Sequence, residues 1–290
     1  MRRLAKESLK KLAAKYHLED YDEKMQKAIL LQLKRRARRR RLITVLCTIL
    51  AVGSLGYFVG YYYLADKSDS QFAELAELKD KEPIVPFRIH KTGEKETPDI
   101  LEEYINLYNK NKSLIGWLKI DDTVIDYPVM QSPDDTYYLN HNFNQEYDRN
   151  GSIFMDPACD VLKPSTNLIL YGHHMKSGNM FGDLDKYVSK EYMKSHEIIQ
   201  FDTLYEKGKW QVMYVFRDTL KQDTEITFKY YQFIEANSAE EFASNMAAMK
   251  EMSLYDTGVE ASYGDQLLTL STCDSAEENG RFVVVAKRVG

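Results

Sequence analysis

The chain has 290 residues, of which 44% are hydrophobic, 12% aromatic and 29% charged, and its formal net charge at pH 7 is −5. This length allows one or two domains with a sizeable core, and the composition excludes collagen-like and wholly disordered chains. Three cysteines without a C-x-x-C pair are too few for a disulfide scaffold and argue against a structural zinc site.

The first 41 residues form a basic tail. They carry a net charge of +10, which leaves −15 for residues 42–290. Apolar residues at helical spacing between Arg3 and Leu33 predict an amphipathic helix on a membrane or against a partner, although a solvated tail without a specific task fits equally well. The run Lys34–Arg41 is also typical of nucleic-acid binding. Beside an apolar span, however, anionic membrane lipids are the simpler partner, and we expect no nucleic acid.

Residues 42–65 are the predicted transmembrane helix. The run contains no charge and spans about 36 Å as a helix, enough to cross a hydrocarbon core of about 30 Å. Tyr57 and the triplet Tyr61–Tyr63 gather at its far end, where aromatic rings favour the membrane interface. A cleaved signal peptide would be shorter and would end in a clean A-x-A site. The basic flank therefore predicts a single-pass anchor with residues 1–41 in the cytoplasm and the remainder outside the cell.

The outer part divides into a stalk and one domain. Residues 66–97 are polar, contain Pro83 and Pro86, and are expected to be a stalk or linker. In the domain, residues 98–290, a helix is expected from a cap at Asp99 to about Lys112. A second helix is expected over Ala239–Glu251, with Ser238 as its N-cap and Phe242, Met246 and Met249 on one face.

Eight short runs in the same domain are rich in β-branched and aromatic residues and are separated by turn signals. They are Gly116–Ile120, Val124–Met130, Ser152–Met155, Leu168–Tyr171, Trp210–Phe216, Ile226–Phe233, Gln266–Ser271 and Phe282–Val289. Many strands and few helices predict a mainly β fold, either a barrel or a sandwich with helical additions.

Reactive side chains follow two apolar strands. Asn167–Met175 ends in Gly172 and two histidines, and Leu267–Asp274 ends in the lone Cys273, with Arg281 eight residues later. A nearby imidazolium favours the nucleophilic thiolate, and a guanidinium is a good donor to an oxyanion, so this set suits acyl transfer through a thioester. From spacing alone, Cys273 can equally be a buried structural residue or the partner of Cys159 in a disulfide.

The segments Tyr171–Met175, Leu270–Asp274 and Gly280–Val284 resemble the signature of class B sortases, the membrane-anchored cysteine transpeptidases of Gram-positive bacteria. Further similar segments follow in the family's order: Leu114–Leu118, Ile125–Val129, Tyr137–Leu139, Gly151–Asp156 and Met180–Gly182. The resemblance covers residues 98–290. It implies a closed β-barrel of about eight strands with N-terminal helices and a helix between the sixth and seventh strands, which Ala239–Glu251 fits.

The resemblance also implies the catalytic roles. Cys273 would be the nucleophile, His173 the general acid and base, and Arg281 the group that stabilises the transition state, whereas His174 is a neighbour of the base. Leu139, Ser271 and Asp274 match positions that line the substrate groove in similar enzymes. No cofactor and no metal ion are expected.

The implied substrate is an exported surface protein with an NPxTN-like signal near its C-terminus, and the implied acceptor is an amine of a cell-wall precursor such as lipid II. A pilin-polymerising sortase, with a pilin lysine as acceptor, is equally compatible with the motifs. A cysteine hydrolase and a catalytically silent extracellular scaffold are the alternatives outside the family's activity. The sequence alone does not choose between the acceptors.

Overall fold

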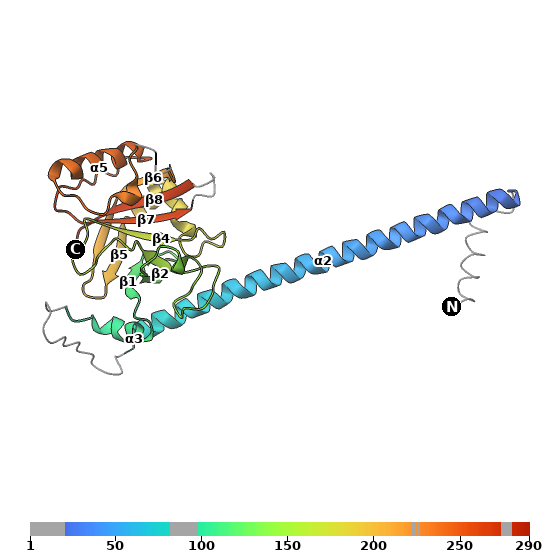
Figure 1. Ribbon diagram of the computed structural model, residues 1–290, viewed down its shortest axis with the longest axis horizontal. Coiled ribbons are helices and arrows are strands. Elements are labelled where there is room, and N and C mark those ends of the chain that lie inside the picture. The colour runs from blue at the N-terminus through green and yellow to red at the C-terminus, as the bar shows by residue number, and fades with distance from the viewer. Residues whose placement is uncertain (1–20, 82–97, 222–223, 225–226, 274–279) are drawn as a thin grey trace. The chain divides into compact units, whose positions relative to one another are not determined.

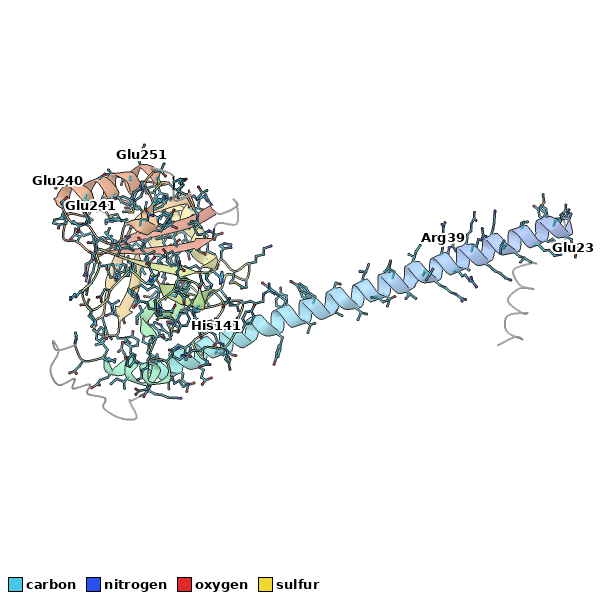
Figure 2. All side chains as sticks on the ribbon, in the orientation of Figure 1. Glu23, Arg39, His141, Glu240, Glu241 and Glu251 are labelled. Carbon is cyan, nitrogen blue, oxygen red and sulfur yellow. The ribbon has the colours of Figure 1, made fainter. Side chains whose placement is uncertain are left out.

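The computed structural model describes residues 21–81, 98–221, 224, 227–273 and 280–290. The chain divides into two compact units, Met1–Asp66 and Lys67–Gly290. A single long helix, α2 (Glu23–Lys79), contains the apolar run, and its part Glu23–Tyr63 includes a window of mean hydropathy 2.2 with no buried residue. Side chains project from this helix all round, Arg39 among them (Figure 2). By length and composition α2 is therefore able to cross a membrane.

In the second unit, the last turns of α2 pack on the folded domain. Leu75 is only 4% exposed, and the ring of Phe72 lies 4.8 Å from that of Tyr127 in an edge-to-face arrangement. Residues 67–79, which lie within the predicted stalk, are thus helical, and Phe72, Leu75, Ala76 and Leu78 among them contribute apolar contacts to the domain. The remainder of the expected stalk, residues 82–97, lies outside the described residues.

Eight strands form the body of the domain (Figure 1). They are β1 (Leu114–Lys119), β2 (Asp126–Met130), β3 (Ile153–Met155), β4 (Asn167–Gly172), β5 (Ile198–Thr203), β6 (Lys209–Thr219), β7 (Leu267–Cys273) and β8 (Gly280–Arg288). They close into a barrel in the order β1-β2-β3-β4-β7-β8-β6-β5. The pairs β2–β3 and β4–β7 are parallel and the other pairs are antiparallel. The expected mainly β barrel is confirmed.

Alternation along the strands separates two apolar layers. On β8, Phe282, Val284 and Ala286 belong to the barrel interior, whereas Val283 and Val285 belong to a second cluster on the outer face. Helix α5 (Ala239–Met252) covers this outer face with one side of its surface (Figure 1). Its outward side carries charged residues, including Glu240, Glu241 and Glu251 (Figure 2). Because one face of β8 fills the barrel and the other lies in the cluster beneath α5, residues 282–286 form a continuous apolar run.

The predicted α5 is confirmed in detail, since it lies between β6 and β7, buries Phe242, Met246 and Met249, and begins at a Ser238 cap that accepts the N–H of Glu241 at 3.1 Å. The other short helices are α3 (Glu102–Lys110), α4 (Lys190–Ser195) and three 3₁₀ turns, η2 (Tyr137–Leu139), η3 (Gly182–Val188) and η4 (Tyr230–Gln232). For α3 the predicted cap is wrong: its N-cap is Leu101 without a side-chain bond, and Asp99 lies outside the helix.

Seven of the eight predicted strands are present. The strand predicted over Ile226–Phe233 is wrong, because the described residues 227–233 contain no strand and include the 3₁₀ turn η4. The strand β5 was not predicted. The strand β5 pairs with both β1 and β6 and thereby closes the barrel.

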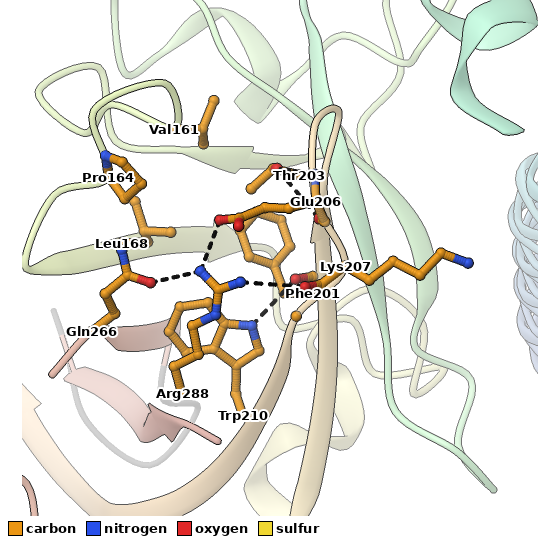
Figure 3. A pocket seen from close by; sticks show the side chains of 11 residues that line it. Val161, Pro164, Leu168, Phe201, Thr203, Glu206, Lys207, Trp210, Gln266 and Arg288 are labelled. Atoms are coloured by element: carbon orange, nitrogen blue, oxygen red, sulfur yellow. Dashed lines mark hydrogen bonds and ion pairs between the residues drawn. The ribbon is translucent and has the colours of Figure 1, made fainter. Parts of the chain in front are cut away.

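At the C-terminal end of β8, Arg288 links this strand to the connection between β5 and β6 and to the start of β7 (Figure 3). The guanidinium of Arg288 donates to the side chains of Glu206 and Gln266, both at 2.7 Å, and lies over the ring of Trp210. The cavity enclosed here is about 10 Å³, which is room for about one water molecule. This cavity therefore offers no space for a peptide.

Candidate active site

The register of three strands brings the predicted catalytic positions together. In the parallel pair β4–β7, Gly172 is opposite Thr272, so the next residues, His173 and Cys273, leave the same end of neighbouring strands. In the antiparallel pair β7–β8, Cys273 is directly opposite Arg281. Neighbouring strands lie about 4.8 Å apart, so the backbone of Cys273 sits between those of His173 and Arg281.

His173 is held by a backbone carbonyl. Its Nε2 lies 2.6 Å from the carbonyl oxygen of Leu139, the last residue of η2. A carbonyl oxygen only accepts hydrogen bonds, so Nε2 carries a proton and Nδ1 is the nitrogen left to exchange one. The side chain is half-buried and lines a groove on the domain surface. His173 thus has the orientation and the access that a proton-transfer group needs.

The neighbouring His174 has a different environment. Its Nε2 lies 3.4 Å from a carboxylate oxygen of Asp185 on η3, and its backbone forms a bridge with Met180. It is not among the residues that line the groove. The geometry therefore favours His173 over His174 as the reactive histidine.

The groove beside these residues has a volume of about 340 Å³. His173, Arg281, Leu139 and Ser271 all line it, so four of the six predicted site residues border one cavity. The structure places Cys273 at the adjoining end of β7, and Asp274 lies outside the described residues. This volume falls within the usual range for small-ligand sites.

Arg281 supplies the positive charge in the groove. Its guanidinium is part-buried, and Nη1 donates to the carbonyl oxygen of Gly280 at 2.9 Å. Arginine keeps its charge at every useful pH, so this side chain cannot act as a base but can stabilise a developing oxyanion.

Several groove residues were not found from the sequence. Tyr230 and Tyr231 come from the connection between β6 and α5, and Tyr171 precedes the histidines on β4. The Tyr230 hydroxyl is 2.8 Å from Oγ of Ser271, and burial raises the pKa of Tyr230, so it stays a neutral hydrogen-bonding group. Its aromatic segment was interpreted as a strand, which hid its place in the groove wall.

Cys159 is a free, buried thiol. Its Sγ lies 3.4 Å from the carbonyl oxygen of Asn167 and 3.4 Å from the N–H of Ile169. Burial raises the pKa of the Cys159 thiol to about 12, which leaves it unreactive near neutral pH. Cys159 is free and lies beside the first residues of β4, whereas Cys273 lies beyond the Gly172 end of that strand, so the alternative of a disulfide between the two is wrong. Within the described ranges, no group of three or more His, Cys, Asp or Glu side chains is arranged to hold a metal ion.

Comparison with known proteins agrees with this geometry. A family model described as the sortase domain matches residues 118–289. Sortase B of Listeria monocytogenes is 36% identical over 193 residues, which cover 66% of this chain and 76% of that protein. Sortase B of Staphylococcus aureus is 31% identical over 259 residues, covering 86% and 98%.

Solved structures show the same fold. Sortase B from B. anthracis superposes with a TM-score of 0.65 at 35% identity and covers 79% of this chain and 99% of its own. A substrate complex of Staphylococcus aureus sortase B superposes with a TM-score of 0.62 at 29% identity, covering 77% and 94%.

Proposed function

Because this chain belongs to the sortase family of cysteine transpeptidases, we propose that it cleaves an NPxTN-like sorting signal near the C-terminus of exported proteins. The acyl group is then joined to an amine of a cell-wall precursor. The observation that supports the proposal is the strand register, which brings the backbones of His173, Cys273 and Arg281 together where His173 and Arg281 line one groove.

In the first half-reaction, the thiol of Cys273 gives its proton to Nδ1 of His173, and the resulting thiolate attacks the carbonyl carbon of the signal's threonine. The carbonyl oxygen becomes an oxyanion, which the guanidinium of Arg281 stabilises. The carbon–nitrogen bond then breaks, and His173 protonates the departing amine while the acyl group remains on sulfur as a thioester. Nδ1 of His173 is the nitrogen that supplies this proton, because Nε2 is engaged by the Leu139 carbonyl.

In the second half-reaction, the acceptor amine attacks the thioester carbonyl. His173 now accepts the amine's proton, the thiolate of Cys273 leaves, and a new amide bond is formed. Leu139 and Ser271 in the groove wall, together with Asp274, are proposed to contact the signal peptide. Support for a peptide groove comes from its size and from a relative whose structure is described as a substrate complex.

The proposal includes a location in the cell. Residues 42–65 anchor the chain as a single-pass helix, with residues 1–41 in the cytoplasm and the remainder outside. The segment 66–97 then links the anchor to the catalytic domain, residues 98–290, and the last turns of α2 within it pack on that domain. The basic run Lys34–Arg41, which we propose meets anionic membrane lipids, supports this orientation.

The acceptor defines the second candidate. Lipid II and a pilin lysine both present a primary amine, so either a wall-anchoring or a pilin-polymerising enzyme fits the same groove. Products with a diaminopimelate-type amine, a glycine peptide and a lysine side chain, compared at equal concentrations, distinguish the two.

The proposal is tested with the full chain in detergent, a fluorescent peptide containing Asn-Pro-Gln-Thr-Asn, and an added amine. We expect an amine-dependent product that disappears in Cys273→Ala and persists in Cys159→Ala, the matched control for a thiol outside the groove. Cleavage that is equal with and without amine, and yields only acid, would identify a hydrolase. Product formation by Cys273→Ala would refute the assigned nucleophile.

A further inference from the structure

Asp218 is a buried carboxylate that the mechanism above does not use. It is next to last in β6, and its side chain is only 5% exposed. Oδ1 accepts the N–H of Thr219 at 2.8 Å and lies 3.0 Å from Nζ of Lys221. Oδ2 is buried and has no hydrogen-bond partner in the part of the chain that the structure describes. A buried carboxylate oxygen without a donor is costly, so its presence calls for a physical explanation.

Arg281 lies directly opposite Asp218 in the antiparallel pair β6–β8. Side chains of directly opposed residues emerge on the same face of a sheet, with their Cβ atoms about 4.5–5.5 Å apart. Two residues earlier on β6, Phe216 is paired with Val283, and both belong to the apolar cluster on the outer face. Asp218 and Arg281 therefore continue this outer-face row toward the groove.

Tyr230 covers the same part of the sheet. Its ring centroid lies 5.7 Å from that of Phe216, and both Asp218 and Arg281 are close enough to influence its ionisation. Tyr230 is 1% exposed, so the two charged groups face a side chain that excludes water. Charges attract one another more strongly in such a low-dielectric setting than in solvent.

We propose that Asp218 is a positioning residue for Arg281. The guanidinium donates one N–H to Oδ2 of Asp218 and, when a peptide lies in the groove, directs its other N–H groups at the reacting carbonyl oxygen. The bond from Nη1 to the Gly280 carbonyl is made to a neutral acceptor, which a side-chain rotation exchanges for the carboxylate. Lys221 remains on Oδ1, so both carboxylate oxygens are then satisfied.

The inference rests on the proposed function, because it concerns how Arg281 is held during acyl transfer. With Asp218 included, the proposed site spans four neighbouring strands: Asp218 lies on β6, Arg281 on β8, Cys273 on β7 and His173 directly after β4. A guanidinium that is already oriented by a hydrogen bond to a carboxylate stabilises the oxyanion without having to move during the reaction.

The test is a double-mutant cycle on the full chain in detergent, with wild type, Asp218→Asn, Arg281→Ala and the double variant. We expect Asp218→Asn to lower kcat about 10- to 100-fold, the size of one charge-assisted hydrogen bond in the transition state, with KM changed by less than about twofold. In the Arg281→Ala background the same change should alter kcat less than about twofold, because the group it positions is gone.

Lys221→Met is the matched control, since it removes the partner of the other carboxylate oxygen. It should change kcat less than about threefold. If the losses of Asp218→Asn and Arg281→Ala multiply, or if Lys221→Met is as slow as Asp218→Asn, the positioning role is wrong. Asp218→Glu, which keeps the charge, should recover part of the loss in kcat.

Thermal unfolding of the same proteins separates this inference from the proposed function. A wild-type chain that forms no amide product refutes the function, yet the melting temperatures still report the contact between Asp218 and Arg281. If the two residues pair, Arg281→Ala leaves a buried carboxylate unpaired and lowers the Tm, even where Asp218→Asn does not fold. Strictly additive shifts in Tm across the cycle, or an unchanged Tm in Arg281→Ala, refute the pairing.

Discussion

Gly151 supports the turn that holds His173, and a single methyl group there should affect both stability and catalysis. Its φ is +61°, a conformation that side chains rarely adopt. A Cβ at this position would contact the carbonyl oxygen of Tyr138 and lie 2.6 Å from that of Leu139. Both are backbone atoms and cannot rotate away. The Leu139 oxygen is also the atom that lies 2.6 Å from Nε2 of His173.

The cost of Gly151→Ala has two parts. The left-handed backbone costs an L-residue about 1–2 kcal/mol, and overpacking against fixed atoms adds about 1–3 kcal/mol. For a folded unit of this size, each kcal/mol lowers the Tm by about 2–4 °C, so a total of about 2–5 kcal/mol corresponds to about 4–20 °C. Displacement of the Leu139 carbonyl turns the imidazole and should lower kcat by at least about tenfold.

Gly258→Ala is the matched control. Gly258 also has a positive φ, +80°, but no atom lies within 4 Å of a Cβ built there. Gly258→Ala should therefore lose only the cost of the left-handed backbone, about 1–2 kcal/mol of stability, and should leave kcat unchanged. Full-length proteins in detergent are compared by thermal unfolding and by amide product formation with the peptide and amine. Equal losses of Tm in the two variants, or a normal kcat in Gly151→Ala, would refute the reasoning.

Three further outcomes are expected. Iodoacetamide at pH 8 should alkylate Cys159 only after denaturation, as peptide mass mapping can show. Because burial raises the pKa of its thiol from 9.0 to about 12, the folded state keeps the proton longer. The contribution of the protonated Cys159 thiol to the free energy of unfolding is therefore fully present below pH 9 and is lost as the pH rises toward 12. Glu206→Gln should cost less than about 1 kcal/mol, since the carboxylate is 44% exposed. The hydrogen bond from Arg288 lowers the pKa of Glu206, so wild type loses this stability as the pH falls below 4.5, and Tm measured against pH should show no such loss in the variant. Ser238→Ala removes the acceptor for the N–H of Glu241 and should lower the Tm by about 2–4 °C, the effect of about 1 kcal/mol, with kcat unchanged; a Tm equal to that of wild type would show that the cap is not stabilising.

The strand β5 could have been predicted from the sequence. Ile199, Phe201 and Thr203 are buried and alternate with half-buried residues, which is the period of two expected of a strand with one buried face. Its position directly after the short helix α4 left few turn residues to mark its start. The alternating pattern of β5 is therefore present in the sequence, but few turn residues mark where the strand begins.

The strand predicted over Ile226–Phe233 fails for a tertiary reason. Its aromatic residues have high β propensity, but β6, the preceding strand, already pairs with β5 on one edge and β8 on the other. In a closed barrel no edge remains for another strand. Tyr230 and Phe233 instead pack on the outer face of the sheet, where they join the cluster beneath α5.

For the candidate active site, local patterns pick out the residues that we propose to react but not their neighbours. Strand ends at Gly172 and Cys273 are visible in the sequence, whereas the parallel pairing of β4 with β7 joins segments about a hundred residues apart. The motifs supplied His173, Cys273 and Arg281. They gave no reason to single out Asp218, because its place opposite Arg281 depends on the pairing of β6 with β8.

The register of the strands also determines which side chains reach the groove, where we propose that the reaction takes place. The side-chain period of a strand is two, so a shift of β8 by one residue would move Arg281 to the barrel interior and bring an apolar neighbour to the groove. Apolar residues on both faces of β8, Val284 inside and Val283 beneath α5, oppose such a shift through the two core clusters. The barrel interior and the cluster beneath α5 therefore hold the register that places Arg281 opposite Cys273.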